Sequence, residues 1–127
     1  MVNLTKELAP RMWRTKQTQD RYQTERQEAV ENDSCPLCMD NSIAEFTHWR
    51  IIPNKYPYDA VANKHTMIIP RTHQKESELS KAALDELHEL KQTTLNKEYL
   101  YIIEGLPSTQ SIPGHFHLHL IAPKAVG

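Results

Sequence analysis

The stretch GHFHLHLIAP, residues 114–123, places histidines and apolar residues at alternate positions. The histidines are His115, His117 and His119. A period of two is typical of a β-strand, whose successive side chains point to opposite faces. We therefore expect the apolar residues to face a hydrophobic core. The three imidazoles should line the other face of the strand, about 7 Å from one to the next.

Composition limits the class of protein. A chain of 127 residues predicts one domain with a sizeable core. The 15 basic and 16 acidic residues give a net charge of −1, which argues against a dedicated nucleic-acid surface. No apolar run is long enough to span a membrane, and the N-terminus lacks the apolar region of a secretory signal. Cys35 and Cys38 form a C-x-x-C pair, which in such a chain indicates a reducing, cytoplasmic location.

The order of elements predicts an α+β fold with an antiparallel sheet. Strands are expected within HWRIIPN (48–54), HTMIIP (65–70), YLYIIEG (99–105) and HFHLHLIAP (115–123). Between the first two, Pro57 and the Asn63–Lys64 pair are typical of turns.

One main helix is expected over residues 81–96. Ser80 is a suitable N-cap, and Leu79 before it and Leu84 within the first turns suit a hydrophobic staple. An apolar stripe is predicted at helical spacing, formed by Ala83, Leu84, Leu87 and Leu90.

Residues 1–32 are polar and helix-compatible, with a break at Pro10, and we separate them from a domain at 33–127. Their apolar residues are too sparse for a buried stripe. We expect an exposed helical extension in which Trp13 and Tyr22 pack on a partner subunit. A solvated, partly disordered arm is the alternative.

Three imidazoles on one strand face suit a metal site, a nucleophile flanked by proton donors, or a solvated polar face. The C-x-x-C pair favours zinc, which needs two further ligands such as histidines. A redox role is disfavoured because no apolar helix follows the CPLC segment (35–38), as is usual for redox pairs.

The motifs together resemble the histidine triad superfamily. HFHLHLI is similar to its His-x-His-x-His-x-x motif, and HTMIIPRTH is similar to its strand-to-helix segment. NKYP resembles the Asn-x-x-Pro turn of several branches. CPLC lies where zinc-bearing members and the related galactose-1-phosphate uridylyltransferases carry a C-x-x-C pair. The resemblance covers about residues 33–123 and excludes the N-terminal extension.

The resemblance implies a nucleotide phosphate hydrolase or nucleotidyl transferase that acts on a nucleotide conjugate. His117 would attack the α-phosphorus and form a nucleotidyl-histidine, which water or another acceptor then releases. His119 would contact the phosphate oxygens, and His65 would orient the triad. The implied ligands of a structural zinc are Cys35, Cys38, His73 and His115.

The sequence departs from the family pattern at the substrate-binding positions. Gln110 and Ser111, the expected phosphate contacts, fit only if Pro113–Gly114 contains an inserted residue. The segment from Asn54, an expected ribose contact, to His65 is longer than is common. His48 is an alternative to His73 at the metal.

Two other functions fit the sequence. One is a zinc-stabilised nucleotide-binding module without turnover. The other is a metalloenzyme whose three strand histidines hold one catalytic metal. Whichever function holds, the resemblance and the exposed sheet edge predict a homodimer, in which the main helix and the following strand form the interface. The residues expected near the interface are Leu87, Leu90, Tyr99 and Tyr101.

Overall fold

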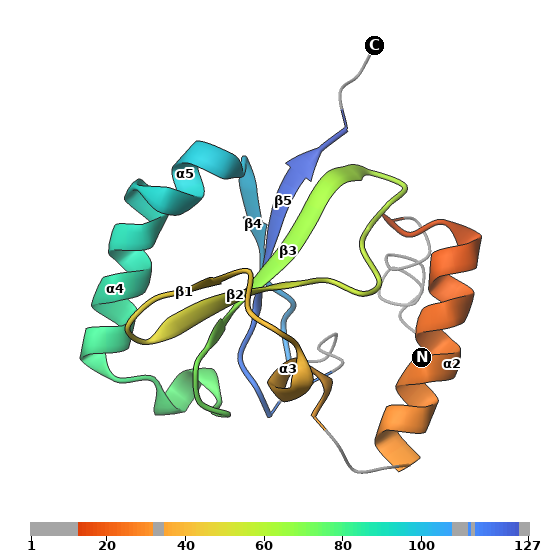
Figure 1. The fold of residues 1–127 in the computed structure, drawn as a ribbon, viewed down its shortest axis with the longest axis horizontal. Coiled ribbons are helices and arrows are strands. Elements are labelled where there is room, and N and C mark those ends of the chain that lie inside the picture. The colour runs from red at the N-terminus through yellow and green to blue at the C-terminus, as the bar shows by residue number, and fades with distance from the viewer. Residues whose placement is uncertain (1–12, 32–34, 108–111, 113, 125–127) are drawn as a thin grey trace.

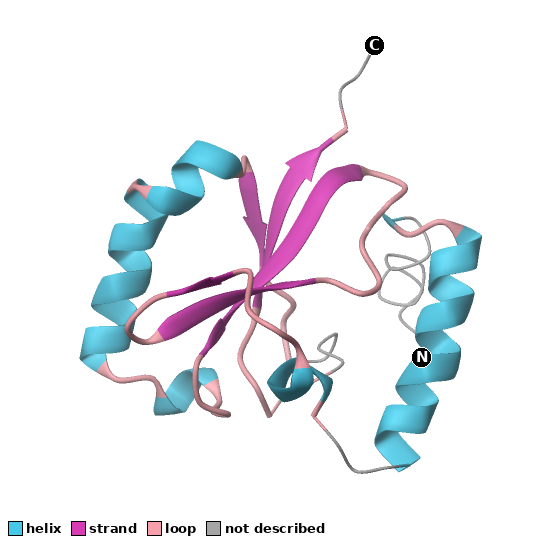
Figure 2. Cartoon of the chain, viewed as in Figure 1, coloured by secondary structure: helices cyan, strands magenta, loops and turns pink. Residues whose placement is uncertain are grey.

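The computed structural model describes residues 13–31, 35–107, 112 and 114–124. Its helices are α2 (Lys16–Glu31), α3 (Pro36–Met39), α4 (Lys81–Gln92) and α5 (Thr94–Glu98), with a 3-10 turn η1 (Glu76–Glu78). Its strands are β1 (Ala44–Glu45), β2 (Trp49–Pro53), β3 (Ala62–Pro70), β4 (Tyr101–Ile103) and β5 (Leu118–Pro123). These strands form one antiparallel sheet in the order β1-β2-β3-β5-β4 (Figure 2). The predicted α+β fold with an antiparallel sheet is confirmed.

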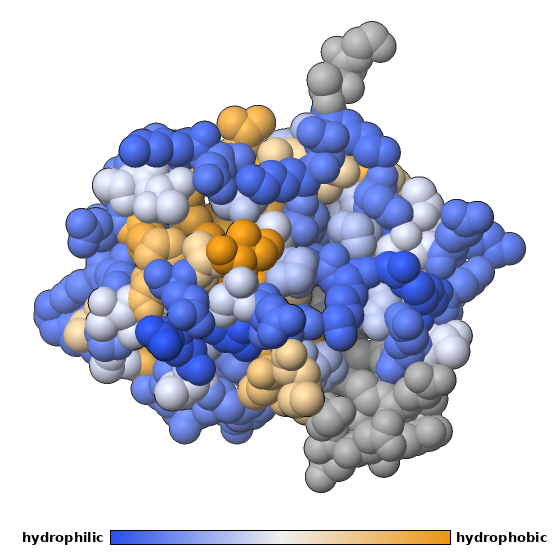
Figure 3. All heavy atoms as spheres, viewed as in Figure 1, coloured by the Kyte–Doolittle hydropathy of each residue, from blue (hydrophilic) through white to orange (hydrophobic). Residues whose placement is uncertain are grey.

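The two faces of the sheet have different coverings. Helices α4 and α5 lie on one side of the sheet and α2 lies beyond the other (Figure 1). The face toward α4 carries the main hydrophobic core, where the indole N–H of Trp49 donates to the Ala83 carbonyl at 2.7 Å. Apolar side chains gather between α4 and the sheet in Figure 3. None of the helices in the described part of the chain is long and apolar enough to cross a membrane.

The prediction that the apolar residues of 115–120 face the core is confirmed. Phe116, Leu118 and Leu120 are buried in the core beside α4. The strand is shorter than predicted, because β5 begins at Leu118 and His115 and His117 precede it.

Strand β3 is longer than predicted. Asn63 and Lys64 were expected at a turn, but both lie within β3. Pairing with the end of β5 extends the strand to Ala62, which lies opposite Pro123, and the register shifts between Ala62 and Lys64. The local turn preference of these residues is overcome by hydrogen bonds to a strand far along the chain.

The predicted main helix is divided in two at Thr93. Its backbone N–H contacts the carbonyls of both Glu89 and Leu90, at 3.1 and 3.3 Å, and its hydroxyl donates to the Glu89 carbonyl at 2.9 Å. Threonine bonded in this way competes with the regular helical pattern. The backbone of Thr93 leaves the helical region, with φ −117° and ψ −91°, and α5 starts one residue later.

The predicted start of α4 is correct. The Ser80 hydroxyl accepts a hydrogen bond from the Ala83 N–H at 3.1 Å, as expected of an N-cap. The proposed staple is wrong, because Leu79 packs on the core whereas Leu84 is 46% exposed. The apolar stripe of α4 is therefore formed by its buried residues alone, which are Ala83, Leu87 and Leu90.

Helix α2 lies against the loop formed by residues 54–60 of the same chain, which we call the 54–60 loop. The ring centroids of Trp13 and Tyr58 are 4.9 Å apart, and those of Tyr22 and Tyr56 are 5.3 Å apart. The two aromatic side chains expected to contact a partner subunit thus contact their own chain. The proposed domain boundary at residue 32 lies outside the described residues and stays a prediction.

Candidate functional site

The face of the sheet away from α4 carries a row of histidines. His65 on β3 and His119 on β5 are near neighbours, because His65 pairs with Ile121 and Met67 pairs with His119. The rings of His117 and His119 lie 5.4 Å apart between centroids. The structure therefore brings together the three predicted catalytic residues, His65, His117 and His119.

His117 has the geometry of a neutral nucleophile. Its Nδ1 lies 2.9 Å from the His115 carbonyl oxygen, so Nδ1 carries the proton and donates it. The lone pair of a neutral ring then resides on Nε2, which makes no hydrogen bond within the described residues. Burial lowers the pKa of His117, an effect partly opposed by this hydrogen bond, and so favours the neutral ring.

His65 and His119 form a hydrogen-bonded pair whose proton positions follow from the backbone. The Tyr58 N–H donates to Nδ1 of His65 at 2.9 Å, so the proton of a neutral His65 lies on Nε2. That atom lies 2.8 Å from Nδ1 of His119 and donates to it. The ring proton of His119 is thereby placed on Nε2, where it is available as a donor.

Both members of the pair are held neutral. Burial, with a smaller contribution from the charge of Arg14, lowers the pKa of His65 to about 4. Burial, followed by the charges of His65, His117 and Arg14, lowers the pKa of His119 to about 2. An imidazolium at either position would be poorly solvated and would repel its neighbours.

We expect acid to destabilise this fold. Below pH about 6.5 the unfolded histidines bind protons that His65 and His119 do not bind in the folded state, so stability is present at neutral pH and falls as the pH falls. Two such groups contribute a loss of about 2 to 4 kcal/mol between pH 7 and pH 5. Urea unfolding at both pH values measures the loss.

The matched variants are His65→Gln and His88→Gln. The first should reduce the dependence on pH, whereas the second should keep it, because His88 is exposed on α4. Comparing these variants separates the loss of stability caused by protonation of the imidazoles from a loss caused by release of a metal ion in acid. Equal pH dependence in all three proteins would contradict the expectation.

Asn54 lies beside the pair. Its side-chain Oδ1 accepts from the Tyr56 N–H at 2.8 Å, so its Nδ2 is an amino group. That Nδ2 is 3.0 Å from Nε2 of His65, and because this nitrogen carries the proton donated to His119, the two groups face each other as donors and form no hydrogen bond. Asn54 thus closes its own turn and reaches the catalytic face. The other two predicted substrate contacts, Gln110 and Ser111, lie outside the described residues.

A second cluster contains all four predicted zinc ligands. The Cys38 sulfur is 3.2 Å from Nδ1 of His73 and 3.3 Å from Nδ1 of His115, and the Cys35 sulfur is 3.6 Å from Nδ1 of His115. One donor atom from each residue lies within 4.8 Å of every other. The cluster is close enough to bind a metal ion, and two sulfurs with two imidazole nitrogens form a donor set that suits tetrahedral zinc.

The local backbone and its hydrogen bonds position the ligands of this cluster. Pro36 opens α3 at its first turn, where its missing N–H costs no helical bond, and the turn brings the two cysteines together. Nε2 of His115 lies 3.2 Å from the Pro70 carbonyl oxygen and donates to it, so Nδ1 faces the sulfurs. At Gly114 an added Cβ would lie 3.3 Å from the His73 ring, so a side chain there would crowd the cluster.

His48 does not join the cluster. It precedes β2, and its backbone N–H donates to the Glu86 carboxylate of α4 at 2.7 Å, on the other side of the sheet from the histidine row. Of the two candidates for the fourth position, His73 is the one that the structure brings to the cysteines.

Sequence reasoning missed Arg14 and Tyr58. The Tyr58 ring lies against both His65 and His119, with centroids 4.4 and 5.2 Å apart. The Arg14 guanidinium lies 4.9 Å from the centre of the Tyr58 ring. The only local sign was the cluster of an arginine with aromatic residues in an otherwise polar extension.

The sequence matches no protein-family model and no curated protein. Among solved structures, the chain is similar to a hypothetical histidine triad nucleotide-binding protein from Sulfolobus tokodaii. The TM-score is 0.52 with 20% identity, over 81% of this chain and 70% of that chain. The chain has the histidine triad fold. A histidine triad protein from Clostridium difficile is similar with a TM-score of 0.47 and 17% identity, over 78% of this chain and 90% of that chain.

In this chain, the histidine triad fold presents two clusters joined by a short segment. His115 contributes its ring to the cysteine cluster and its carbonyl oxygen to Nδ1 of His117. The position of the His117 ring is therefore linked to the place where a metal would bind.

Proposed function

We propose that this protein is an enzyme that cleaves a nucleotide conjugate through a nucleotidyl intermediate on His117. The observation that carries the proposal is the hydrogen bond from Nδ1 of His117 to the His115 carbonyl, which leaves Nε2 as a fixed, neutral nucleophile. The fold is consistent with the nucleotide-binding description of the Sulfolobus tokodaii protein.

The proposed reaction has two steps. Nε2 of His117 attacks the α-phosphorus, a P–N bond forms, and the bond from phosphorus to the leaving group breaks with its electron pair. Water or another acceptor then attacks phosphorus and loses its proton to solvent, and the P–N bond breaks with its electron pair returning to Nε2 of His117. Attack by water gives hydrolysis, and attack by another acceptor gives nucleotidyl transfer.

The neighbouring groups suit the charge that develops. The Nε2–H of His119 is a donor for a non-bridging phosphate oxygen, and His65 keeps that proton in place through Nδ1 of His119. Asn54 is proposed to contact the ribose, and Gln110 and Ser111 to contact the phosphate.

We infer that Cys35, Cys38, His73 and His115 hold a structural zinc ion. Zinc would supply a rigid tetrahedral centre and no step of the reaction. The chain's own contribution is that a fixed His115 also fixes the carbonyl that orients His117. We place the protein in the cytoplasm, where reduced thiols persist.

Intact-protein mass tests the proposed reaction. Brief exposure to a nucleoside phosphoramidate should add the mass of one nucleotidyl group, and His117→Ala should show no adduct. The alternative function, a nucleotide-binding module without turnover, predicts binding by calorimetry with no adduct and no released mononucleotide. That result would refute the enzymatic proposal.

The metalloenzyme alternative is disfavoured by the way the triad is engaged. Nδ1 of His117 faces a carbonyl, Nδ1 of His119 faces His65, and Nδ1 of His115 faces the cysteines. Among the described residues, the group found close enough for a metal is the cysteine cluster.

We also propose a homodimer that pairs two copies through β4, an edge strand of the sheet. Tyr101 on β4 is 63% exposed and Leu100 beside it is 72% exposed. Three other residues expected near the interface are buried in the chain's own core, so we do not propose them as contacts: Leu87, Leu90 and Tyr99.

Light scattering should give twice the chain mass at micromolar concentration. Tyr101→Glu should shift the protein toward monomer, because like charges would meet across a two-fold axis. Ile43→Glu is the control, because Ile43 is 60% exposed and lies beside β1 at the opposite edge of the sheet. A monomeric wild-type protein would contradict the proposal.

A further inference from the structure

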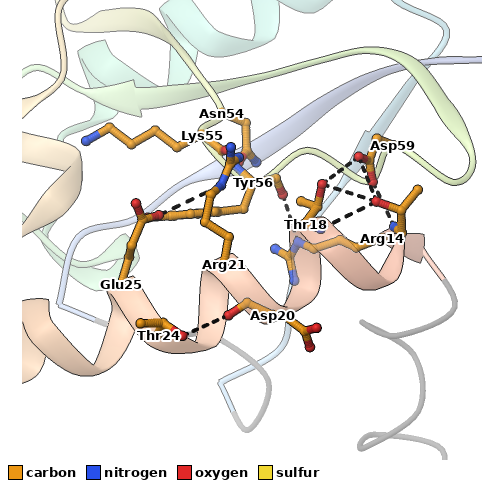
Figure 4. Close-up of polar contacts among 11 residues, drawn as sticks. Arg14, Thr18, Asp20, Arg21, Thr24, Glu25, Asn54, Lys55, Tyr56 and Asp59 are labelled. Carbon is orange, nitrogen blue, oxygen red and sulfur yellow. Dashed lines mark hydrogen bonds and ion pairs between the residues drawn. The ribbon is translucent and has the colours of Figure 1, made fainter.

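Helix α2 and the segment before it are fastened to the 54–60 loop by side-chain hydrogen bonds (Figure 4). The Asp59 carboxylate accepts from the Thr15 N–H at 2.8 Å, from the Thr15 hydroxyl at 3.1 Å and from the Thr18 hydroxyl at 2.6 Å. Thr15 also caps α2, since its hydroxyl accepts from the Thr18 N–H at 3.4 Å. The start of the helix and the loop therefore form one unit.

Arg14 is a buried arginine within this unit. Its guanidinium lies 4.3 Å from the ring centre of Tyr22 and 4.9 Å from that of Tyr58. Its Nε donates to the Tyr56 carbonyl at 2.7 Å and its Nη1 donates to the Gln19 side-chain oxygen at 3.2 Å. A planar guanidinium can stack on rings and donate in its own plane at the same time, which an ammonium cannot do.

Tyr58, which Arg14 contacts, also contacts two histidines of the row. Its ring is tilted against His65 and stacked on His119, at 28° to the latter. Its backbone N–H donates to Nδ1 of His65. One residue of the loop therefore touches both rings and selects which nitrogen of His65 carries the proton.

The tautomer of His65 in turn determines the tautomer of His119. With Nδ1 of His65 occupied as an acceptor, the proton lies on Nε2 and is donated to Nδ1 of His119. If the loop moved away, Nδ1 of His65 would lose its donor, and both rings would be free to exchange tautomers.

We propose that Arg14 is a positioning residue that holds Tyr58 in place and thereby sets the tautomer of the His65–His119 pair. The N-terminal extension then belongs to the functional site, although it lies outside the segment that resembles the superfamily. Only the consequence for turnover rests on the proposed function; the tautomer can be measured without substrate.

The test is a long-range proton–nitrogen NMR spectrum of histidine rings in the full-length, nitrogen-labelled protein. In the wild type, His65 and His119 should each show a protonated Nε2 and an unprotonated Nδ1. In Arg14→Ala, both rings should show nitrogen shifts averaged between the two tautomers.

The matched control is Arg21→Ala. Arg21 also extends from α2 to the loop, where it lies 5.3 Å from the ring centre of Tyr56 and donates to the Lys55 carbonyl, but it is exposed. It should leave the spectrum unchanged. Wild-type ring signals in Arg14→Ala, or equal changes in both variants, would overturn the proposal.

Tyr58 provides a second route if Arg14→Ala fails to fold. Tyr58→Phe keeps the ring contacts and should keep the wild-type tautomers, whereas Tyr58→Leu removes the ring and should shift both histidines. Wild-type signals in Tyr58→Leu would also overturn the proposal.

Turnover gives a separate readout. With a nucleoside phosphoramidate, kcat of Arg14→Ala should fall about 10- to 100-fold, since small misplacements of catalytic groups have effects of this size. KM should change little. A wild-type protein without turnover would refute the proposed function and leave the NMR result to decide the role of Arg14.

Discussion

His117→Ala should reduce turnover of a nucleoside phosphoramidate by at least about 10⁴-fold, as expected for the loss of a covalent nucleophile. The reason is specific to this ring. Its Nδ1 is engaged by the His115 carbonyl, so Nε2 is the nitrogen with a lone pair. No other ring in the row combines a backbone acceptor on Nδ1 with an unengaged Nε2 among the described residues. Released mononucleotide and intact-protein mass measure the loss.

Two variants make this result interpretable. His119→Ala should lose a donor to the phosphate while keeping the nucleophile, so it should turn over about 10²- to 10³-fold more slowly and still form the adduct. His88→Ala changes an exposed histidine on α4 and should behave as wild type. An adduct on the His117→Ala protein, or activity above a few per cent, would contradict the assignment of the nucleophile.

The two faces of the sheet could be predicted from the sequence because the relevant signal is local. Alternation along residues 115–120 placed Phe116, Leu118 and Leu120 in the core, and an N-cap serine located the start of α4. Neither inference required knowledge of contacts with residues that are distant in sequence. The four members of the cysteine cluster were likewise named from spacing and resemblance, and the structure brings them together.

What failed depends either on partners that are distant in sequence or on a local choice that the sequence leaves open. Asn63 and Lys64 have turn preferences, yet pairing with β5 draws them into β3. The helix break at Thr93 follows from a side-chain hydroxyl that donates to the Glu89 carbonyl, one of two arrangements that a threonine can take in a helix.

The N-terminal extension illustrates the same limit at the site. In residues 13–25, the part of the extension whose side chains the structure describes, the buried residues are polar, as the sparse apolar residues predicted. The contacts of Arg14 with Tyr56 and Tyr58 exist only because the 54–60 loop folds back beside the extension. A sequence pattern within the extension contains no information on that loop, so a role for Arg14 required the structure.

The second large effect is expected at the cysteine cluster. The purified protein should contain about one zinc ion per chain, and Cys38→Ser should lower both the zinc content and the melting temperature. Two thiols and two imidazoles are gathered within 4.8 Å. Burial, with a hydrogen bond to Cys35, raises the pKa of Cys38 to about 11, so the Cys38 thiol stays protonated unless a cation favours its thiolate.

Binding of zinc would convert this cluster, in which His115 is buried and Cys38 and His73 are exposed, into a cross-link between α3, the residues after β3 and the segment before β5. Structural zinc contributes directly to folding, so loss of one ligand should cost about 3 kcal/mol or more. That corresponds to a fall of about 10 °C or more in melting temperature for a domain of this size. Metal analysis and thermal unfolding, with and without a chelator, measure both quantities.

The ligand set itself is tested by two histidine variants of identical chemistry. His73→Gln should lose zinc, because Nδ1 of His73 lies 3.2 Å from the Cys38 sulfur. His48→Gln should retain it, since His48 is held toward α4 by the bond between its backbone N–H and Glu86. Loss of zinc in His48→Gln alone would reverse the assignment of the fourth ligand. A metal-free wild-type protein whose stability is unaffected by chelator or added zinc would refute the zinc site altogether, because the linkage between metal binding and folding would then be absent.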